Sequence, residues 1–239
     1  MNIALIGYGR MGHEIKKMAV KMGHRVTVKI DVNNLEDLNP EKLADADVVI
    51  EFTTPDSAFR NIAKCLEMSK PVVSGTTGWL KHYDEAVKLC LKHETSFIHS
   101  SNFSIGVNIL YRVNSELARL MAGHKEYKPF IEEIHHSKKL DAPSGTAIVL
   151  AEEIRKQHPS YEGWCPADEP MNNCIPIKSV RRGKIPGTHI VVWDSDVDTI
   201  SLKHKAKGRK GFALGAIIAA EYIKSRKGVF TMADVLGFR

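Results

Sequence analysis

The first hundred residues alternate apolar runs of strand length with segments of helical periodicity. The apolar runs cover residues 2–7, 25–30, 47–52, 71–75 and 96–100. The helical segments cover residues 11–22, a stretch opened by Pro55, and residues 83–91. Strands that are apolar throughout and alternate with amphipathic helices are typical of a parallel sheet covered on both faces. This half of the chain is therefore predicted to be a doubly wound α/β domain.

The pattern changes after residue 106. We expect helices at residues 107–121 and 144–156, a strand at 128–136, and a polar, proline-containing excursion at 158–173. Strand-like runs at 175–181, 188–194 and 199–205 then follow one another without helices between them, and an apolar helix covers 212–223. Successive strands predict a mixed-sheet α+β domain. The predicted boundaries are 1–104, completed by 212–239, for the first domain and 105–211 for the second.

The composition of the chain indicates which kinds of ligand the protein is expected to bind. The formal net charge of +6 is concentrated in residues 202–211, without an aromatic stacking motif, so we expect small anionic ligands rather than nucleic acid. No apolar run approaches the length of a membrane span. Met1 is followed directly by a strand-like run, and the four cysteines show neither CxxC nor zinc spacing. We therefore expect a cytoplasmic protein with reduced Cys65, Cys90, Cys165 and Cys174, and no metal.

A glycine-rich loop, GYGRMG, joins the first strand to the first helix. Gly7 permits a tight turn, Gly9 lets the backbone approach a pyrophosphate, and Gly12 allows close packing of helix and strand. Amides at the start of the helix favour an anion. Asp31 ends the second strand, where a carboxylate accepts hydrogen bonds from ribose hydroxyls. The predicted dinucleotide contacts here are Gly7, Tyr8, Gly9, Arg10, Met11, Gly12 and Asp31.

Two further loops follow strands of the same predicted sheet. GTTG follows the fourth strand and SSNFS the fifth, and ligands of open parallel sheets lie beyond these carboxyl ends. Ordinary turn chemistry is the alternative, but the position favours contacts with the nicotinamide end. The predicted contacts are Gly75, Thr76, Thr77, Ser100, Ser101, Asn102 and Phe103.

The segment EEIHHSKKLDAPSGTA contains the densest titratable chemistry. Reduction of a conjugated double bond by a dinucleotide also needs a proton. His135, His136 and Lys139 offer a group that titrates near neutrality and a cationic donor, and the sequence alone leaves their division of tasks open. A helix beginning near Gly145 and Thr146 presents amides and a hydroxyl that suit a carboxylate.

These motifs, with GRKGFALGA and the closing MADVLGF, resemble the 4-hydroxy-tetrahydrodipicolinate reductase (dihydrodipicolinate reductase) family over essentially the whole chain. The resemblance implies a Rossmann-type domain, a substrate-binding and oligomerisation domain, and a homotetramer. It also implies reduction of a small cyclic dicarboxylate in the diaminopimelate route to lysine. By the same resemblance, His135 is the catalytic acid/base and Lys139 the proton donor. His136, Gly145 and Thr146 bind substrate carboxylates, and Arg209 and Phe212 lie near the cofactor.

The sequence departs from many family members in two places. Its glycine loop is one residue shorter, and Val32 follows Asp31 where some members have a basic residue. The second departure leaves the choice between NADH and NADPH open, and the repulsion between Asp31 and a 2′-phosphate favours NADH. Two alternatives to the reductase are a dinucleotide-sensing regulator without turnover and an amino-acid dehydrogenase on a similar scaffold. The paired His135 and Lys139 disfavour the first, and the DAPSGTA turn disfavours the second.

Overall fold

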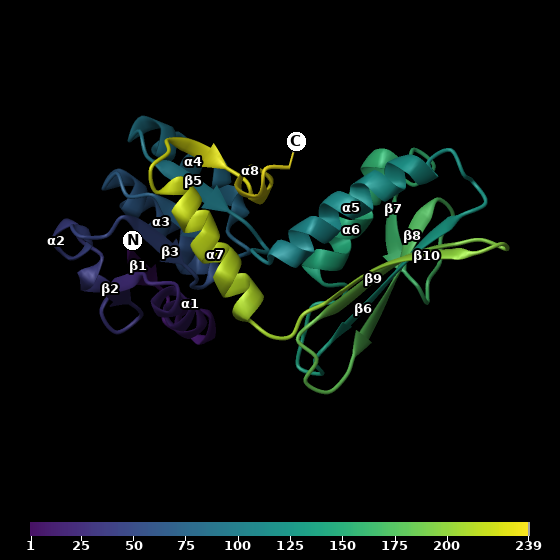
Figure 1. Cartoon of the computed structure of the whole chain (residues 1–239), viewed down its shortest axis with the longest axis horizontal. Coiled ribbons are helices and arrows are strands. Elements are labelled where there is room, and N and C mark those ends of the chain that lie inside the picture. Colours follow the sequence, from purple (N-terminus) through teal and green to yellow (C-terminus); the bar gives the residue numbers. More distant parts are fainter. Residues whose placement is uncertain (239) are drawn as a thin grey trace. The chain divides into compact units, whose positions relative to one another are not determined.

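The computed structural model describes residues 1–238 (Figure 1). The chain divides into two compact units. One consists of Met1–Ile105 together with the segment from Arg209 onward, and the other consists of Gly106–Gly208. The C-terminal segment therefore returns to the unit in which the chain begins. Within the described residues, no helix combines the length and apolar character needed to cross a membrane.

The first unit is built on one parallel sheet. Its strands are β1 (Asn2–Ile6), β2 (Arg25–Ile30), β3 (Val48–Glu51), β4 (Val72–Ser74), β5 (Ser96–His99) and β11 (Gly228–Phe230). They lie in the order β11-β5-β4-β3-β1-β2, and every pair is parallel. The five predicted strands are confirmed. Strand β11 was not predicted from the sequence.

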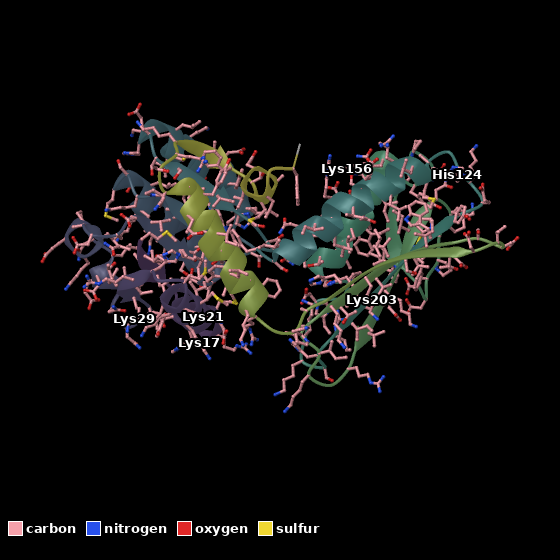
Figure 2. The ribbon with its side chains drawn as sticks, viewed as in Figure 1. Lys17, Lys21, Lys29, His124, Lys156 and Lys203 are labelled. Carbon is pink, nitrogen blue, oxygen red and sulfur yellow. A yellow bond between two sulfur atoms is a disulfide. The ribbon has the colours of Figure 1, made fainter. Side chains whose placement is uncertain are left out.

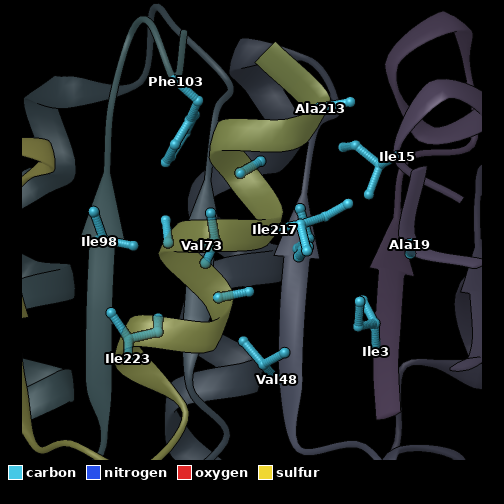
Figure 3. Packing of buried hydrophobic residues seen from close by; sticks show 14 of the residues in the cluster. Ile3, Ile15, Ala19, Val48, Val73, Ile98, Phe103, Ala213, Ile217 and Ile223 are labelled. Carbon is cyan, nitrogen blue, oxygen red and sulfur yellow. The ribbon is translucent and has the colours of Figure 1, made fainter. Parts of the chain in front are cut away.

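Helices cover both faces of this sheet. They are α1 (Arg10–Lys21), α2 (Pro40–Leu43), α3 (Pro55–Glu67), α4 (Tyr83–Lys92), α7 (Lys210–Ile223) and α8 (Met232–Leu236), with 3₁₀ turns at Leu35–Asp37 and Leu80–His82. Because strand side chains alternate, Ile3 joins the core beneath α1 and α7, while Ala4 joins the opposite core with α3 and α4. Figure 3 shows α7 laid across the sheet, with Ile217 among side chains of β1, β3 and β4. The doubly wound prediction is confirmed.

The second unit is a mixed sheet with two long helices. Its elements are α5 (Ile105–Met121), β6 (Lys128–His135), α6 (Gly145–Gln157), β7 (Gly163–Pro166), β8 (Cys174–Arg181), β9 (Thr188–Asp194) and β10 (Thr199–Lys205). The strand order is β10-β9-β6-β8-β7, antiparallel from β10 to β6 and parallel from β6 to β7. Leu150 and Ile154 of α6 pack into the same core as Ile131 and Trp193 of the sheet. The mixed-sheet prediction is confirmed.

Two expectations about the excursion at 158–173 and its surroundings were wrong. The excursion contains a strand, β7, which pairs with β8 in parallel. That pairing brings Cys165 within 5.9 Å of Cys174 between Cα atoms, and the two form a disulfide. This disulfide was not predicted, because two cysteines with eight residues between them match no recognised motif. Cys65 and Cys90 are free and buried, as expected.

Candidate active site

The glycine loop between β1 and α1 has the shape that its sequence predicts. Gly7 has a φ of +88°, and a Cβ there would lie 2.0 Å from the carbonyl oxygen of Phe52. A Cβ on Gly12 would lie 2.3 Å from the carbonyl oxygen of Gly7. At Gly9, by contrast, a Cβ would meet no atom within 4 Å. Gly7 and Gly12 are therefore required by the fold, whereas the space beside Gly9 is open for a ligand.

Gly9 is also the N-cap of α1, so no side chain of its own caps the helix. Arg10, Met11 and Gly12 form the first turn, and no acidic side chain stands there. The amides of such a turn carry partial positive charge and bind anions. The loop and the helix start thus fit a pyrophosphate.

The loops after β4 and β5 contribute to a cavity of about 250 Å³ in the first unit. Its lining residues are Met11, Phe52, Gly75, Ser100, Ser101, Phe103, Arg209 and Phe212. All of these except Phe52 are predicted cofactor contacts, drawn from four separate parts of the chain. A Cβ on Gly75 would lie 2.1 Å from the ring of Phe52, so glycine lets that ring form one wall. Phe103 is also a core residue, 1% exposed, and its ring lies 6.0 Å from that of Phe52.

The remaining residues of these loops have structural partners. Thr76 is 5% exposed, and its hydroxyl donates to Glu51 Oε1 at 2.7 Å. Asn102 is 7% exposed, and its side-chain oxygen accepts from the amide of Ser104 at 2.9 Å. Thr77, in contrast, is exposed. The carbonyl of Thr76 also accepts from Trp79 Nε1 at 2.8 Å, and the amide of Asn102 donates to the hydroxyl of Ser100 at 3.2 Å. Thr76 and Asn102 therefore shape the loops.

Glu51 is a buried carboxylate that the sequence analysis did not single out. It ends β3 and is fully buried. Its Oε1 accepts from the amide and hydroxyl of Thr53 and from Thr76, and its Oε2 accepts from Ser74 at 2.6 Å. The carboxylate therefore ties the ends of β3 and β4 to the loop that follows Gly75. An acidic residue at the end of an otherwise apolar strand was the available signal.

Asp31 lies directly after β2, and its carboxylate accepts from the amide of Val32 at 3.0 Å. Lys29 extends from the same strand toward the glycine loop, where its Nζ lies 5.1 Å from the centre of the Tyr8 ring. Lys16 of α1 also lies over this ring, with its Nζ 6.0 Å from the centre; Figure 2 labels Lys29 on β2 and Lys17 and Lys21 on α1. The end of β2 thus combines one carboxylate with a cationic side chain held over Tyr8.

In the second unit, His135 is the last residue of β6 and is 8% exposed. Its Nδ1 lies directly against Glu133 Oε2. Its Nε2 faces Gly187, where a Cβ would lie 3.0 Å away. The ring of His189 lies 5.1 Å from that of His135. Burial and the charge of His135 lower the pKa of His189 to about 3. His189 is therefore neutral near pH 7.

Lys139 lies in the turn after β6. Its Nζ is 2.8 and 2.7 Å from the two carboxylate oxygens of Asp141. Burial raises the pKa of Asp141, but the hydrogen bond and charge of Lys139 outweigh it and leave that pKa below its ordinary value. The Ala142–Pro143 peptide that follows is cis. His136 stands between His135 and this turn, and its carbonyl accepts from the amide of Lys139 at 3.1 Å.

The predicted carboxylate ligands stand at the start of α6. Ser144 is the N-cap, and its hydroxyl accepts from the amide of Ala147 at 3.3 Å. Gly145 begins the helix, and a Cβ there would meet nothing within 4 Å. Burial raises the pKa of Tyr111 to about 12, while a hydrogen bond with Thr146 opposes that rise. The helix start therefore combines open space at Gly145 with the hydroxyl of Thr146 near Tyr111.

One buried group in this unit also has the chemistry of a metal site. Ligand atoms of Glu133, His135 and His189 lie within 4.8 Å of one another. Arg181 lies 2.8 Å from the same carboxylate, however, and supplies a positive charge there already. A divalent ion would have to compete with that guanidinium, so the cluster suits a hydrogen-bonded network better than a metal.

Comparisons with known proteins match both units. The family model described as "Dihydrodipicolinate reductase, N-terminus" matches residues 1–103, and "Dihydrodipicolinate reductase, C-terminus" matches residues 106–236. A 4-hydroxy-tetrahydrodipicolinate reductase from Christiangramia forsetii is 48% identical over 238 residues, which cover 99% of this chain and 98% of that protein. Another from Neisseria gonorrhoeae is 33% identical over 92% of this chain and 83% of that protein.

A solved structure shows the same fold. It is a dipicolinate-bound dihydrodipicolinate reductase from Paenisporosarcina sp. TG-14, with a TM-score of 0.78 and 24% identity. The likeness covers 98% of each chain. With both family models matched in sequence order and a relative of nearly equal length at 48% identity, the chain belongs to the dihydrodipicolinate reductase family.

Proposed function

We propose that the chain uses NADH or NADPH to reduce 4-hydroxy-tetrahydrodipicolinate to tetrahydrodipicolinate, with loss of water, in the diaminopimelate route to lysine. The observation that carries this proposal is the family match through both units. The second unit also joins His135, Lys139 and the start of α6 through one short segment. An acid, a cation and a carboxylate site are the groups that a cyclic, unsaturated dicarboxylate requires.

The substrate carboxylates bind at the start of α6 and in the turn before it. Gly145 contributes an amide beside open space, and Thr146 contributes its hydroxyl. His136 supplies a further donor. A dipicolinate-bound relative with the same fold supports a planar dicarboxylate as a ligand of this site.

His135 and Lys139 handle the proton. His135 acts as acid and base through the imidazole at the end of β6, and Lys139 donates a proton as negative charge develops on the ring. In the structure the ammonium of Lys139 pairs with Asp141, which is 61% exposed at its side chain. An incoming carboxylate competes for the same ammonium, so we expect Lys139 to exchange Asp141 for substrate.

The first unit binds the dinucleotide. When bound, the reduced nicotinamide supplies the hydride. The loop at Gly9 and the first turn of α1 hold the pyrophosphate, and Asp31 accepts from a ribose. The cavity beside Gly75, Arg209 and Phe212 has largely apolar walls and a volume of about 250 Å³, which suits one planar ring.

We propose that NADH is used at least as well as NADPH. Asp31 accepts from the 2′-hydroxyl of NADH and repels the 2′-phosphate of NADPH, at a cost on the order of 1–3 kcal/mol for an uncompensated pair. Lys29 offsets part of that repulsion, because its side chain is directed toward the glycine loop. The expected preference is therefore at the lower end of that range.

We further propose a cytoplasmic homotetramer, as the family resemblance implies. Strand β10 forms one edge of the second unit's sheet and leaves side chains such as Ile200 exposed, 37% in that case. An edge strand with exposed apolar side chains favours pairing with another chain. The mass in solution, measured by light scattering, tests the assembly.

The experiment for the reaction is a coupled assay. Dehydratase and its substrates are supplied with the purified protein, and oxidation of NADH or NADPH is followed by nicotinamide absorbance. The proposal predicts turnover with both dinucleotides. Folded protein that binds dinucleotide without turnover would support a sensor instead. Turnover of an amino acid without dehydratase would support an amino-acid dehydrogenase.

A further inference from the structure

Glu133 is a buried carboxylate to which the proposed reaction assigns no role. It lies on β6 two residues before His135 and is fully buried. The two oxygens face different partners. Oε1 accepts from Arg181 at 2.8 Å and from the amide of Ser144 at 3.2 Å, while Oε2 faces Nδ1 of His135.

The carboxylate of Glu133 is ionised near pH 7. Burial alone would raise the pKa of Glu133, but its close contacts with His135 and Arg181 hold that pKa far below its ordinary value. An ionised carboxylate can only accept hydrogen bonds. Oε2 therefore requires a hydrogen on Nδ1 of His135.

We propose that Glu133, held by Arg181 and Ser144, is the positioning residue of His135. It fixes the ring with its hydrogen on Nδ1, so that Nε2 is the nitrogen that exchanges a proton with substrate. This inference rests on the proposed role of His135 and concerns the tautomer that the role requires.

Two contacts and one open space make this arrangement specific. Arg181 also donates to the carbonyl of Asp141, so one guanidinium connects the carboxylate to the turn that carries Lys139. Ser144 connects the same oxygen to the start of α6. On the far side of the ring, Gly187 has no side chain, which leaves room beside Nε2. In catalytic triads, too, a carboxylate accepts a hydrogen bond from Nδ1–H of a histidine, and Nε2 of that histidine transfers the proton.

The test is Glu133→Gln, because its outcome can be predicted atom by atom. Arg181 and Ser144 both donate to the Oε1 position, so the amide oxygen of glutamine must occupy it. The amide NH₂ then occupies the Oε2 position and faces Nδ1 as a donor. The neutral ring must accept there, which moves its hydrogen to Nε2. We expect kcat to fall about 10²-fold or more, with dinucleotide affinity within twofold of the parent.

The readout that a purely structural role would not change is the tautomer. Two-bond ¹H–¹⁵N spectra of the imidazole, recorded at about pH 8.5 where an ordinary histidine is neutral, distinguish the two forms. The His135 signals are assigned by their loss in His135→Gln. The parent should show the Nδ1–H form and Glu133→Gln the Nε2–H form. The matched control is Glu132→Gln on the same strand, whose carboxylate pairs with Lys178 at 3.2 Å, and it should leave tautomer and kcat unchanged.

The parent spectrum decides the matter even if Glu133→Gln does not fold. An Nε2–H tautomer in the parent would overturn the proposal without any variant. A folded Glu133→Gln protein with parental kcat and parental tautomer would overturn it as well, whatever its melting temperature. Because the tautomer is read without substrate, failure of the coupled assay would refute the reductase function and leave this measurement interpretable.

Discussion

Replacing Gly9 with alanine tests whether the space beside this residue is needed for ligand binding, because the substitution should leave the fold nearly unchanged. A Cβ at this position would meet nothing within 4 Å, and the backbone, at φ −79° and ψ −155°, is accessible to alanine. The remaining cost is the weaker N-cap preference of alanine, about 0.5–1 kcal/mol. For a chain of this size that corresponds to a fall in melting temperature of roughly 1–4 °C. The methyl group nevertheless fills space that the pyrophosphate requires.

We expect the dissociation constant for NADH to rise at least tenfold, a loss of about 1.4 kcal/mol, measured by isothermal titration calorimetry. Two further alanine variants bracket the result. Gly12→Ala places a Cβ 2.3 Å from the carbonyl oxygen of Gly7, so it should lose stability as well as binding. Gly123→Ala also meets nothing within 4 Å but lies outside the proposed binding loops, so it should change neither. Parental NADH affinity in Gly9→Ala would refute the placement of the pyrophosphate.

Four other outcomes follow from the site. His135→Ala and Lys139→Ala should each lower kcat by about 10²–10⁴ with dinucleotide affinity preserved; near-parental kcat in both would remove them from the mechanism. Thr146→Val should lower kcat/KM roughly tenfold or more, since a charge-assisted hydrogen bond contributes about 1.5–3 kcal/mol, and should weaken inhibition by a pyridine dicarboxylate; unchanged inhibition would contradict this. Asp31→Ala should weaken NADH more than NADPH in kcat/KM at fixed ionic strength, and a clear NADPH preference in the parent would show that Lys29 prevails. The pKa of His189 falls from 6.5 in the unfolded chain to about 3 in the folded protein. Between pH 6.5 and pH 3 the unfolded chain therefore binds one more proton at this residue than the folded protein does. The free energy of unfolding then decreases as the pH is lowered, by at most about 1.4 kcal/mol per pH unit from His189. Denaturant unfolding of His189→Asn should show a shallower slope over that range, and an unchanged slope would contradict the assignment.

The sequence predicted the elements whose apolar patterns are long and regular. Ile3, Val49 and Ile217 are fully buried, and the two strands and the helix that contain them are mostly apolar, so local pattern and tertiary environment agree. Strands β7 and β11 have four and three residues, and their pairing partners rather than their own sequences make them strands. The disulfide of Cys165 with Cys174 follows from the β7–β8 pairing and was missed for the same reason.

In the candidate site, too, the features that could be predicted are contiguous in the sequence, and those that were missed depend on residues far apart in it. The glycine loop and the start of α6 are local motifs, so their residue types and spacing were sufficient to find them. The partners of those motifs come from elsewhere. Glu51 is bound by Ser74 on the next strand and by Thr76 in the loop after it, and Arg181 reaches Glu133 across the β6–β8 pair. Buried carboxylates of this kind are visible in sequence only as acids in apolar strands.

The most direct test of the reductase function follows the hydride itself. Dehydratase product is supplied to the protein with NADH dideuterated at C4 of the nicotinamide, and the reduced product is analysed by mass spectrometry. We expect a tetrahydrodipicolinate one mass unit heavier than that formed with ordinary NADH, at a rate that His135→Ala lowers about 10²–10⁴-fold. An unlabelled product, or folded protein that consumes no dinucleotide, would contradict it.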